Sequence, residues 1–315
     1  MAALVHLIVF VLALQGQGAR RTPAVGPCGD PVSFQVLLDR RGFSPGEIDG
    51  TLGENAARAL RAFQQAHGLP ATGHPDCATW KALETPAAPE PLTTYRITAA
   101  DAQGPFTPDI PADLMEQARL PALDYRNLTE KLSERFHAAP QLLVALNHGK
   151  KIEPGETIRV PNVTPYVLTR TRPVGARSAD VTVEVSRSRS TLRVTRRDGS
   201  LVFDAPVSSG SEHDPLPIGH WHVTTVSWMP EFHYNPALFW DANPSNAKAT
   251  IKPGPNGPVG VVWVDINVPH YGLHGSGEPA LIGHAQSHGC VRLTNWDAAR
   301  LAAMVGPGTP VIFEE

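Results

Sequence analysis

The chain has 315 residues, of which 42% are hydrophobic and 18% charged, and its formal net charge is −3. This length suggests two or three domains with packed cores. Because the charge is close to balanced, no basic surface is indicated, and nucleic acid is excluded as an expected partner. Proline is unusually common, with 31 copies. Since proline interrupts helices and central strands, we expect many of these residues in loops and linkers.

The N-terminus begins with an apolar run, LVHLIVFVLAL at residues 4–14, followed by the small and polar residues QGQGA. Such a run is too short to span a bilayer but suits the core of a secretory signal. We therefore expect residues 1–19 to be a signal peptide. The mature chain would then lie in the periplasm or cell-wall space, with no stable membrane span. No Lys or Arg precedes the run, and a buried N-terminal strand is the alternative.

The chain contains three cysteines, Cys28, Cys77 and Cys290. In an exported protein an even set pairs and an odd one stands out. Cys28 and Cys77 bracket one compact stretch, and a disulfide between them would close a loop worth about 4 kcal/mol in the chain-entropy model. Cys290 would then be a free thiol, which needs a reason in an oxidising compartment. The alternative is that all three are buried and inert.

Residues 28–84 carry a helical pattern, and the third predicted helix has Asp76 as its N-cap. No catalytic group stands out in this three-helix module. Its stretch IDGTLGENAARALRAFQQAHGLPATG, residues 48–73, resembles the three-helix peptidoglycan-binding domain. The resemblance implies adhesion to cell-wall glycan or peptide rather than catalysis.

A proline-rich linker is expected over residues 85–118, semi-rigid in character. Residues 119–165 then predict two short helices broken at Pro140, and a strand over 157–163. With a weak first strand near Tyr125–Asn127, this segment resembles a LysM module, a glycan-binding βααβ unit. The alternative interpretation is a helical spacer.

From residue 178 to 315 the pattern changes to alternating apolar and polar residues, typical of strands. Asp198-Gly199 is a hairpin turn signal. A single helix is expected after Cys290, beginning near Asn295. The whole chain is therefore predicted to be multidomain α+β, with a β-rich C-terminal domain.

Cys290 lies in the run SHGCVRL, and a cysteine becomes a nucleophile only as the thiolate. Two histidines could carry its proton. His288 is two residues away, which is a long separation along an extended chain. His274 comes from a separate segment and could face Cys290 across a strand pair, so it is slightly preferred. Gly289 allows the backbone to approach a substrate closely, and Arg292 could assist ionisation or hold a carboxylate.

A metal site is the rival interpretation of these histidines. The candidate pairs are His220/His222, His270/His274 and His284/His288. The surrounding glycines and Pro269 argue against the helices that the i, i+4 pairs would need.

His274-Gly275 followed by SHGCVRL at residues 287–293 resembles the signature of the L,D-transpeptidase catalytic domain, over roughly residues 181–313. The resemblance implies that Cys290 is the nucleophile and His274 the acid/base, with Gly275 in the loop that orients it. It assigns the substrate and oxyanion pocket to Tyr271, Gly275, Ser287, His288, Gly289 and Arg292. No acidic partner for His274 is apparent, so we expect a backbone carbonyl to orient it.

The sequence thus predicts an exported L,D-transpeptidase that needs no metal or organic cofactor. Its partners would be peptidoglycan stem peptides and glycan. The resemblance implies that Cys290 attacks a tetrapeptide stem at the amide after the L-centre of a diamino acid, releasing D-alanine, and that an amine then resolves the thioester. One alternative is an L,D-carboxypeptidase or crosslink-cleaving hydrolase on the same scaffold. A second is a non-catalytic wall-binding protein.

Overall fold

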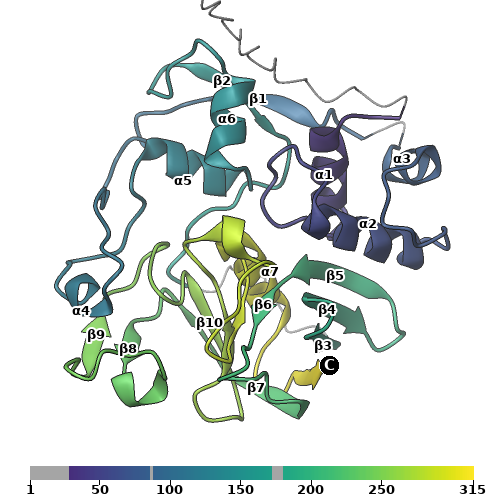
Figure 1. Ribbon diagram of the computed structural model, residues 1–315. Helices are drawn as coiled ribbons and strands as arrows, with labels where there is room; N and C mark the ends of the chain where they lie inside the picture. The colour runs from purple at the N-terminus through teal and green to yellow at the C-terminus, as the bar shows by residue number, and fades with distance from the viewer. Residues whose placement is uncertain (1–27, 86–87, 172–179) are drawn as a thin grey trace, which may run out of the picture.

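A computed structural model describes residues 28–85, 88–171 and 180–315 (Figure 1). The expected signal peptide, residues 1–19, lies outside the described residues. Among those that are described, no helix combines the length and the apolar character needed to cross a membrane.

The first module consists of three helices, α1 (Pro31–Arg40), α2 (Glu54–Ala66) and α3 (Cys77–Leu83). Asp76 caps α3 by accepting a hydrogen bond from the Thr79 amide, as the sequence predicted. The core of the module is apolar and aromatic, and it includes Phe34, Leu38 and Phe63. The expected disulfide joins Cys28 to Cys77, with Cα atoms 5.1 Å apart. The first turn of the chain is thereby tied to the start of α3.

The middle of the chain has two strands, β1 (Leu92–Arg96) and β2 (Thr157–Pro161), which pair antiparallel along their whole length. Between them lie α4 (Leu114–Gln117), α5 (Leu128–Arg135) and α6 (Pro140–Leu146). The break between α5 and α6 falls before Pro140, as predicted, because proline is tolerated at the first position of a helix.

Two expectations about this region were wrong. The first strand does not lie near Tyr125–Asn127: these residues are irregular, and Asn127 caps α5 by accepting from the Glu130 amide. The strand is β1, inside residues 85–118, where a free linker was expected. Proline on both sides hid this five-residue strand, whose partner β2 lies some sixty residues further along the chain.

The C-terminal domain is β-rich. Within the described residues its largest sheet has nine strands in the order β5-β4-β3-β13-β7-β10-β11-β12-β6, and β8 pairs with β9 separately. Most neighbours are antiparallel, but β13 runs parallel to β3 and β11 parallel to β12. The predicted helix α7 begins at Asn295, and the predicted turn at Asp198-Gly199 joins β4 to β5. The elements are β3 (Val181–Ser186), β4 (Thr191–Arg196), β5 (Leu201–Pro206), β6 (Ser208–Ser209), β7 (Gly219–Trp228), β8 (Phe232–Tyr234), η1 (Pro236–Leu238), β9 (Ala249–Ile251), β10 (Val262–Ile266), β11 (Gly272–His274), η2 (Pro279–Leu281), β12 (Val291–Arg292), α7 (Asn295–Met304) and β13 (Pro310–Glu314).

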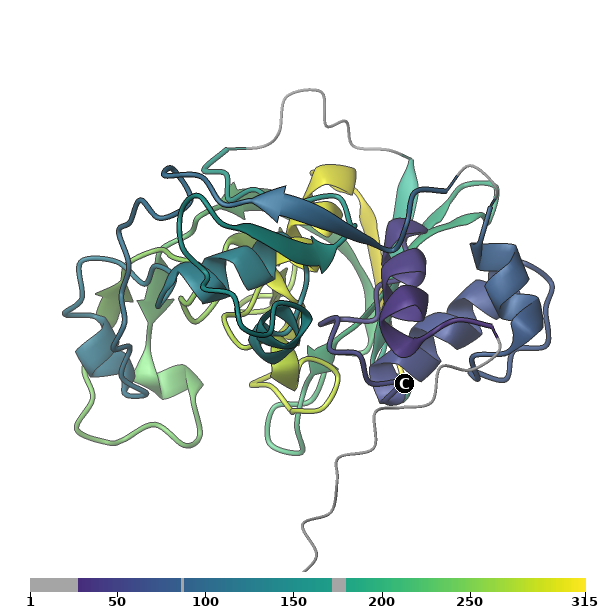
Figure 2. The same ribbon diagram turned by 90° about the horizontal axis from the view of Figure 1, so that it is seen from above.

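The three parts of the chain pack directly on one another, as Figures 1 and 2 show. At their junction Arg300 of α7 donates two hydrogen bonds to Asp39 of α1, at 3.0 and 2.7 Å. His137, from the turn between α5 and α6, lies with Nδ1 3.0 Å from the same carboxylate. Ser44 donates to Asp297 at 2.7 Å beside them. One buried polar cluster therefore draws residues from all three parts.

Two further contacts tie the modules to the loops of the β-rich domain. Asn55 of α2 donates from Nδ2 to the Ile282 carbonyl at 2.8 Å. Glu134 of α5 accepts from Nδ2 of Asn295 at 2.9 Å, where both side chains are buried. The N-terminal and middle modules thus contact segments that flank the run containing Cys290.

Candidate active site

His274 ends strand β11, and Cys290 directly precedes the neighbouring strand β12. Strands β11 and β12 run parallel, with Leu273 opposite Val291 and His274 opposite Arg292. Cys290 directly precedes β12, so the same register places it beside Gly272. Its half-buried Sγ lies 3.6 Å from the His270 carbonyl, to which the thiol donates. The strand pair therefore places these two residues, which the sequence separates by sixteen positions, on adjacent segments, and both line one cavity.

His274 is buried, with 5% of its surface exposed, and its ring is fixed on two sides. Nδ1 lies 2.7 Å from the Gly275 carbonyl, which can only accept, so Nδ1 carries the proton and Nε2 is left as an acceptor. The indole of Trp263 stacks on the imidazole, with centroids 5.4 Å apart and planes 18° apart. The expected orienting carbonyl is therefore that of Gly275.

The electrostatics of the site keep both groups neutral at rest. Burial, helped by the Arg292 charge and opposed by the bond to Gly275, lowers the pKa of His274 to about 4. Burial raises the pKa of the Cys290 thiol to about 11, more than the Gly272 N–H and the Arg292 charge lower it. The neutral thiol and the neutral imidazole are therefore the dominant forms near pH 7.

Glycine is required at position 289. Its φ is +93°, and a Cβ there would lie 2.4 Å from the Tyr271 ring. The neighbouring Ser287 holds this turn, because its Oγ donates to the Cys290 carbonyl at 2.5 Å and accepts from the Gly210 amide at 2.7 Å. The run SHGC is thus shaped by backbone contacts on both sides of the thiol.

His288 occupies a different place from His274. Its Nε2 lies 2.9 Å from Oδ1 of Asp241, and the Phe239 ring packs against its edge at 5.1 Å. Arg292 is held by a bond from Nη2 to the Gln286 carbonyl.

Most of the predicted site residues share one cavity of about 1440 Å³. Its lining includes Tyr271, His274, Ser287, His288, Cys290 and Arg292. Gly275 does not line it. That glycine lies behind His274, where a Cβ would meet Asn295 Oδ1 at 2.3 Å.

Several residues of the site were missed by the sequence analysis. Trp263 had a signal, because it alternates with Asp265 on one face of β10 and Asp265 accepts from its indole N–H at 3.2 Å. Asp241 lies in an irregular loop, and the cavity wall formed by residues 110–114 comes from the middle module. Neither of these leaves a periodic pattern in the sequence.

The histidine pairs of the rival metal interpretation do not assemble into a ligand set in the part of the chain that the structure describes, where no three His, Cys, Asp or Glu side chains cluster suitably for a metal ion. His220 and His222 lie on β7 opposite β13.

The fold and site define a cysteine-dependent acyl-transfer domain attached to a helical binding module. Residues 180–313 match the model of the L,D-transpeptidase catalytic domain, and residues 29–83 match that of a peptidoglycan binding domain. Residues 180–313 are thus an L,D-transpeptidase domain, whose function is peptidoglycan crosslinking, and the chain also carries a peptidoglycan-binding module. Enzymes of this cell-wall family act outside the cytoplasm.

Individual relatives agree with this assignment. A protein of Bacillus licheniformis assigned as the L,D-transpeptidase YkuD is 28% identical over 188 residues, which are 58% of this chain and 90% of the relative. Its namesake in Bacillus subtilis is 47% identical over 57 residues, 18% of this chain and 35% of that protein.

Solved structures are more distant. An L,D-transpeptidase from Mycobacterium smegmatis is 20% identical, with a TM-score of 0.36 over 53% of this chain and 76% of the other. L,D-transpeptidase 3 from Mycobacterium tuberculosis with a faropenem-derived adduct is also 20% identical, with a TM-score of 0.37 over 51% and 75%.

Proposed function

We propose that Cys290 is the nucleophile and His274 the acid/base of a transpeptidation on tetrapeptide stems. Sγ attacks the carbonyl of the amide that follows the L-centre of the diamino acid, while Nε2 of His274 takes the thiol proton. The tetrahedral intermediate collapses as His274 returns that proton to the leaving nitrogen, and D-alanine departs. An amine of a second stem then attacks the thioester, and the thiol is regenerated.

One observation carries this assignment: the Gly275 carbonyl holds Nδ1–H at 2.7 Å and leaves Nε2 as an acceptor, on the strand beside Cys290. A general base must be neutral at the working pH, and burial keeps the pKa of His274 at about 4. The Gly272 N–H beside the sulfur favours the thiolate, which is the form of Cys290 that attacks.

The remaining pocket residues support this reaction without carrying the proton. Ser287 and Gly289 shape the turn that presents the thiol. Tyr271, His288 and Arg292 line the cavity in which the stem would lie.

Intact-mass kinetics of acylation test the ranking of these residues. Cys290→Ala should abolish acyl-enzyme formation with a tetrapeptide or a carbapenem. His274→Ala should slow acylation by roughly 10²–10⁴-fold, the usual scale for a positioned acid–base group. His288→Ala should be less severe, because Asp241 rather than Cys290 is its hydrogen-bond partner. Native-rate acylation by His274→Ala would show that another group carries the proton.

The hydrolase alternative differs from the transpeptidase in the acceptor of the acyl group, which is water rather than an amine. Muropeptide mass spectrometry after incubation with the protein separates the outcomes: dimers support transfer to an amine, shortened monomers support transfer to water, and no change supports a binding protein without activity.

We further propose that β1, α5, α6 and β2 form a LysM-like glycan-binding unit. The order strand-helix-helix-strand and the antiparallel pairing of β1 with β2 support it. The connection of some thirty residues between β1 and α5 departs from a compact βααβ unit. Pull-down of the full chain on peptidoglycan with its stem peptides removed should retain binding if the glycan is recognised.

We also propose that the chain is exported to the periplasm or cell-wall space after removal of residues 1–19. The apolar run at residues 4–14 supports this. N-terminal sequencing of the protein recovered from outside the cytoplasm should begin near Arg20.

A further inference from the structure

The cavity that contains Cys290 is not built by the catalytic domain alone. Its lining includes Ile110 to Leu114, Gln117 and Arg126, all from the connection between β1 and α5. Figure 1 shows α4 of this connection beside β8 and β9. A substrate lying in the cavity would therefore contact residues outside the matched range 180–313.

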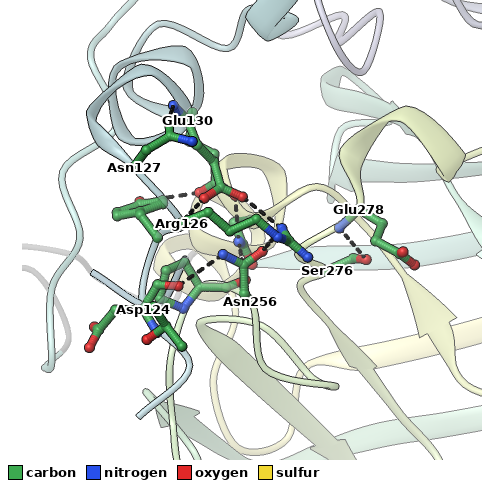
Figure 3. Close-up of polar contacts among 12 residues, drawn as sticks. Asp124, Arg126, Asn127, Glu130, Asn256, Ser276 and Glu278 are labelled. Atoms are coloured by element: carbon green, nitrogen blue, oxygen red, sulfur yellow. Dashed lines mark hydrogen bonds and ion pairs between the residues drawn. The ribbon is translucent and has the colours of Figure 1, made fainter. Parts of the chain in front are cut away.

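Arg126 is the basic side chain that this connection contributes to the cavity, and it is held rigidly (Figure 3). Its Nη1 donates to Glu130 Oε1 and to Asn256 Oδ1, both at 3.0 Å. Asn256 is in turn fixed by donating from Nδ2 to the Asp124 carbonyl at 3.0 Å. The guanidinium thus bridges the middle module and the catalytic domain.

The hydrogen bonds of Arg126 leave one edge of the guanidinium open. Both partners are bound by Nη1, and among the described residues neither Nε nor Nη2 donates to any group. The side chain is 40% exposed. The Nε–Nη2 edge is one that binds a carboxylate through two parallel hydrogen bonds. Arg126 is therefore fixed through Nη1, and its Nε and Nη2 donors remain available to a carboxylate.

The charges around the cavity favour Arg126 as the place where a substrate carboxylate binds. Its only other arginine among the described lining residues is Arg292, next to the reacting centre. The lining carboxylates outnumber the arginines: Asp113, Asp214, Glu231, Asp241 and Glu278. An anionic group is disfavoured along most of this surface, so a carboxylate of the substrate would be held where a guanidinium is open.

Chain connectivity sets an upper limit on the distance between Arg126 and the reacting centre. Gly277 is three residues from His274, at most about 11 Å along the chain. A Cβ on Gly277 would lie 2.7 Å from Asn256 Cα, so this loop packs on the residue that holds Arg126. The guanidinium thus lies within roughly 20 Å of His274, and an extended tetrapeptide spans about 14 Å before its side chains are counted.

We propose that Arg126, fixed by Asn256, forms a carboxylate subsite that binds an anionic group of the stem peptide, two or more residues away from the reacting carbonyl. This subsite rests on the proposed function, because it takes the stem peptide as the occupant of the cavity. The carboxylate belongs either to the acyl donor or to the acceptor. Arg126 binds the substrate and takes no part in proton transfer.

The experiment compares Arg126→Gln with the wild-type full chain, varying donor and acceptor peptides in turn. Each is supplied as the free acid and with the remote carboxylate amidated. A charge-assisted bond is worth about 1.5–3 kcal/mol, so kcat/KM for the peptide that carries the bound carboxylate should fall about 10–100-fold, mainly through KM. Amidation of that peptide should lower the wild type to the level of Arg126→Gln and leave the variant unchanged. The peptide that shows this pattern identifies the source.

Matched controls separate recognition from damage to the fold. Arg119→Gln removes an exposed arginine of the same connection that does not line the cavity, and it should leave kcat/KM unchanged. Alkylation of Cys290 by iodoacetamide, which is neutral, should proceed equally in Arg126→Gln and the wild type. Arg126→Lys should recover only part of the loss, since it restores the charge but not the two parallel donors.

Binding of the same peptides to Cys290→Ala, with and without Arg126→Gln, repeats the comparison without turnover. Equal loss for free-acid and amidated peptides, or no loss, would overturn the subsite. If the wild type neither binds nor converts any stem peptide, the proposed function fails instead, and the alkylation control shows whether the site is intact.

Discussion

Replacing Asp39 with alanine removes the carboxylate that joins all three parts of the chain, and we expect the free energy of unfolding to fall by about 3 kcal/mol. Asp39 is 1% exposed and accepts from both Nη atoms of Arg300 and from His137. Burial raises its pKa, but the Arg300 charge and the contact with His137 outweigh burial and hold the pKa well below the usual range. The carboxylate is therefore ionised and paired.

The size of the loss in unfolding free energy follows from the unpaired charge that Asp39→Ala leaves on Arg300. Removing one partner of a buried ion pair costs about 3–5 kcal/mol, because the other charge stays desolvated. The lower end applies here, since the Arg300 side chain is 24% exposed and Asp297 remains 3.6 Å away. Buried His137 loses its Nδ1 partner in addition. For a chain of 315 residues the loss corresponds to a fall in Tm of roughly 4–5 °C.

Thermal unfolding followed by tryptophan fluorescence measures this loss, because Trp296 stacks on His137 and reports on the junction directly. The matched control is Asp180→Ala, which breaks an exposed ion pair with Arg197 and should change stability by less than about 1 kcal/mol. If Asp39→Ala melts like Asp180→Ala, the junction does not hold the modules together as argued.

The other predictions concern the turn, the acid–base balance and the disulfide. Gly289→Ala should slow acylation at least 10-fold, measured by intact mass, because the φ of +93° and the Tyr271 ring leave no room for a Cβ; native kinetics would contradict this. Burial raises the pKa of Glu134 to about 8, so its contribution to stability is complete below about pH 4.5 and is lost as pH rises through 8. Tm should thus decline over that window, and Glu134→Gln should decline less; parallel curves would refute the assignment. Reducing the Cys28–Cys77 disulfide should destabilise the first module by about 4 kcal/mol, and thiol counting on the denatured, unreduced chain should find one free cysteine; three would exclude the disulfide.

Much of the secondary structure could be predicted from local sequence patterns. The helices around Pro140, the cap at Asp76 and the turn at Asp198-Gly199 are set by neighbours in sequence, and each was predictable from a few residues. The pairing of His274 with Cys290 was expected from their residue types and from the family resemblance, but their place beside parallel strands β11 and β12 was not predicted.

Contacts between distant residues were not predictable in this way. Asp39 and Arg300 are 261 positions apart, and neither residue differs in its local sequence from an ordinary exposed charge. The role of Arg126 was equally unpredictable, because it lies in an irregular segment and depends on a hydrogen bond to Asn256, 130 positions away. β1 was missed because a short strand between prolines is recognisable only by its partner.

The junction around Asp39 bears on how the enzyme meets its polymeric substrate. If a flexible linker joined the wall-binding module to the catalytic domain, the active site could reach any stem peptide within the length of the linker. The linker length would then set the effective concentration of stems. Here direct packing replaces such a linker, so the offset between anchor and thiol is a fixed property of the folded chain. A glycan strand held by the N-terminal module would present either a stem at the correct distance and orientation or none at all. Reactivity would then depend on the spacing of strands in the wall rather than on the abundance of stems.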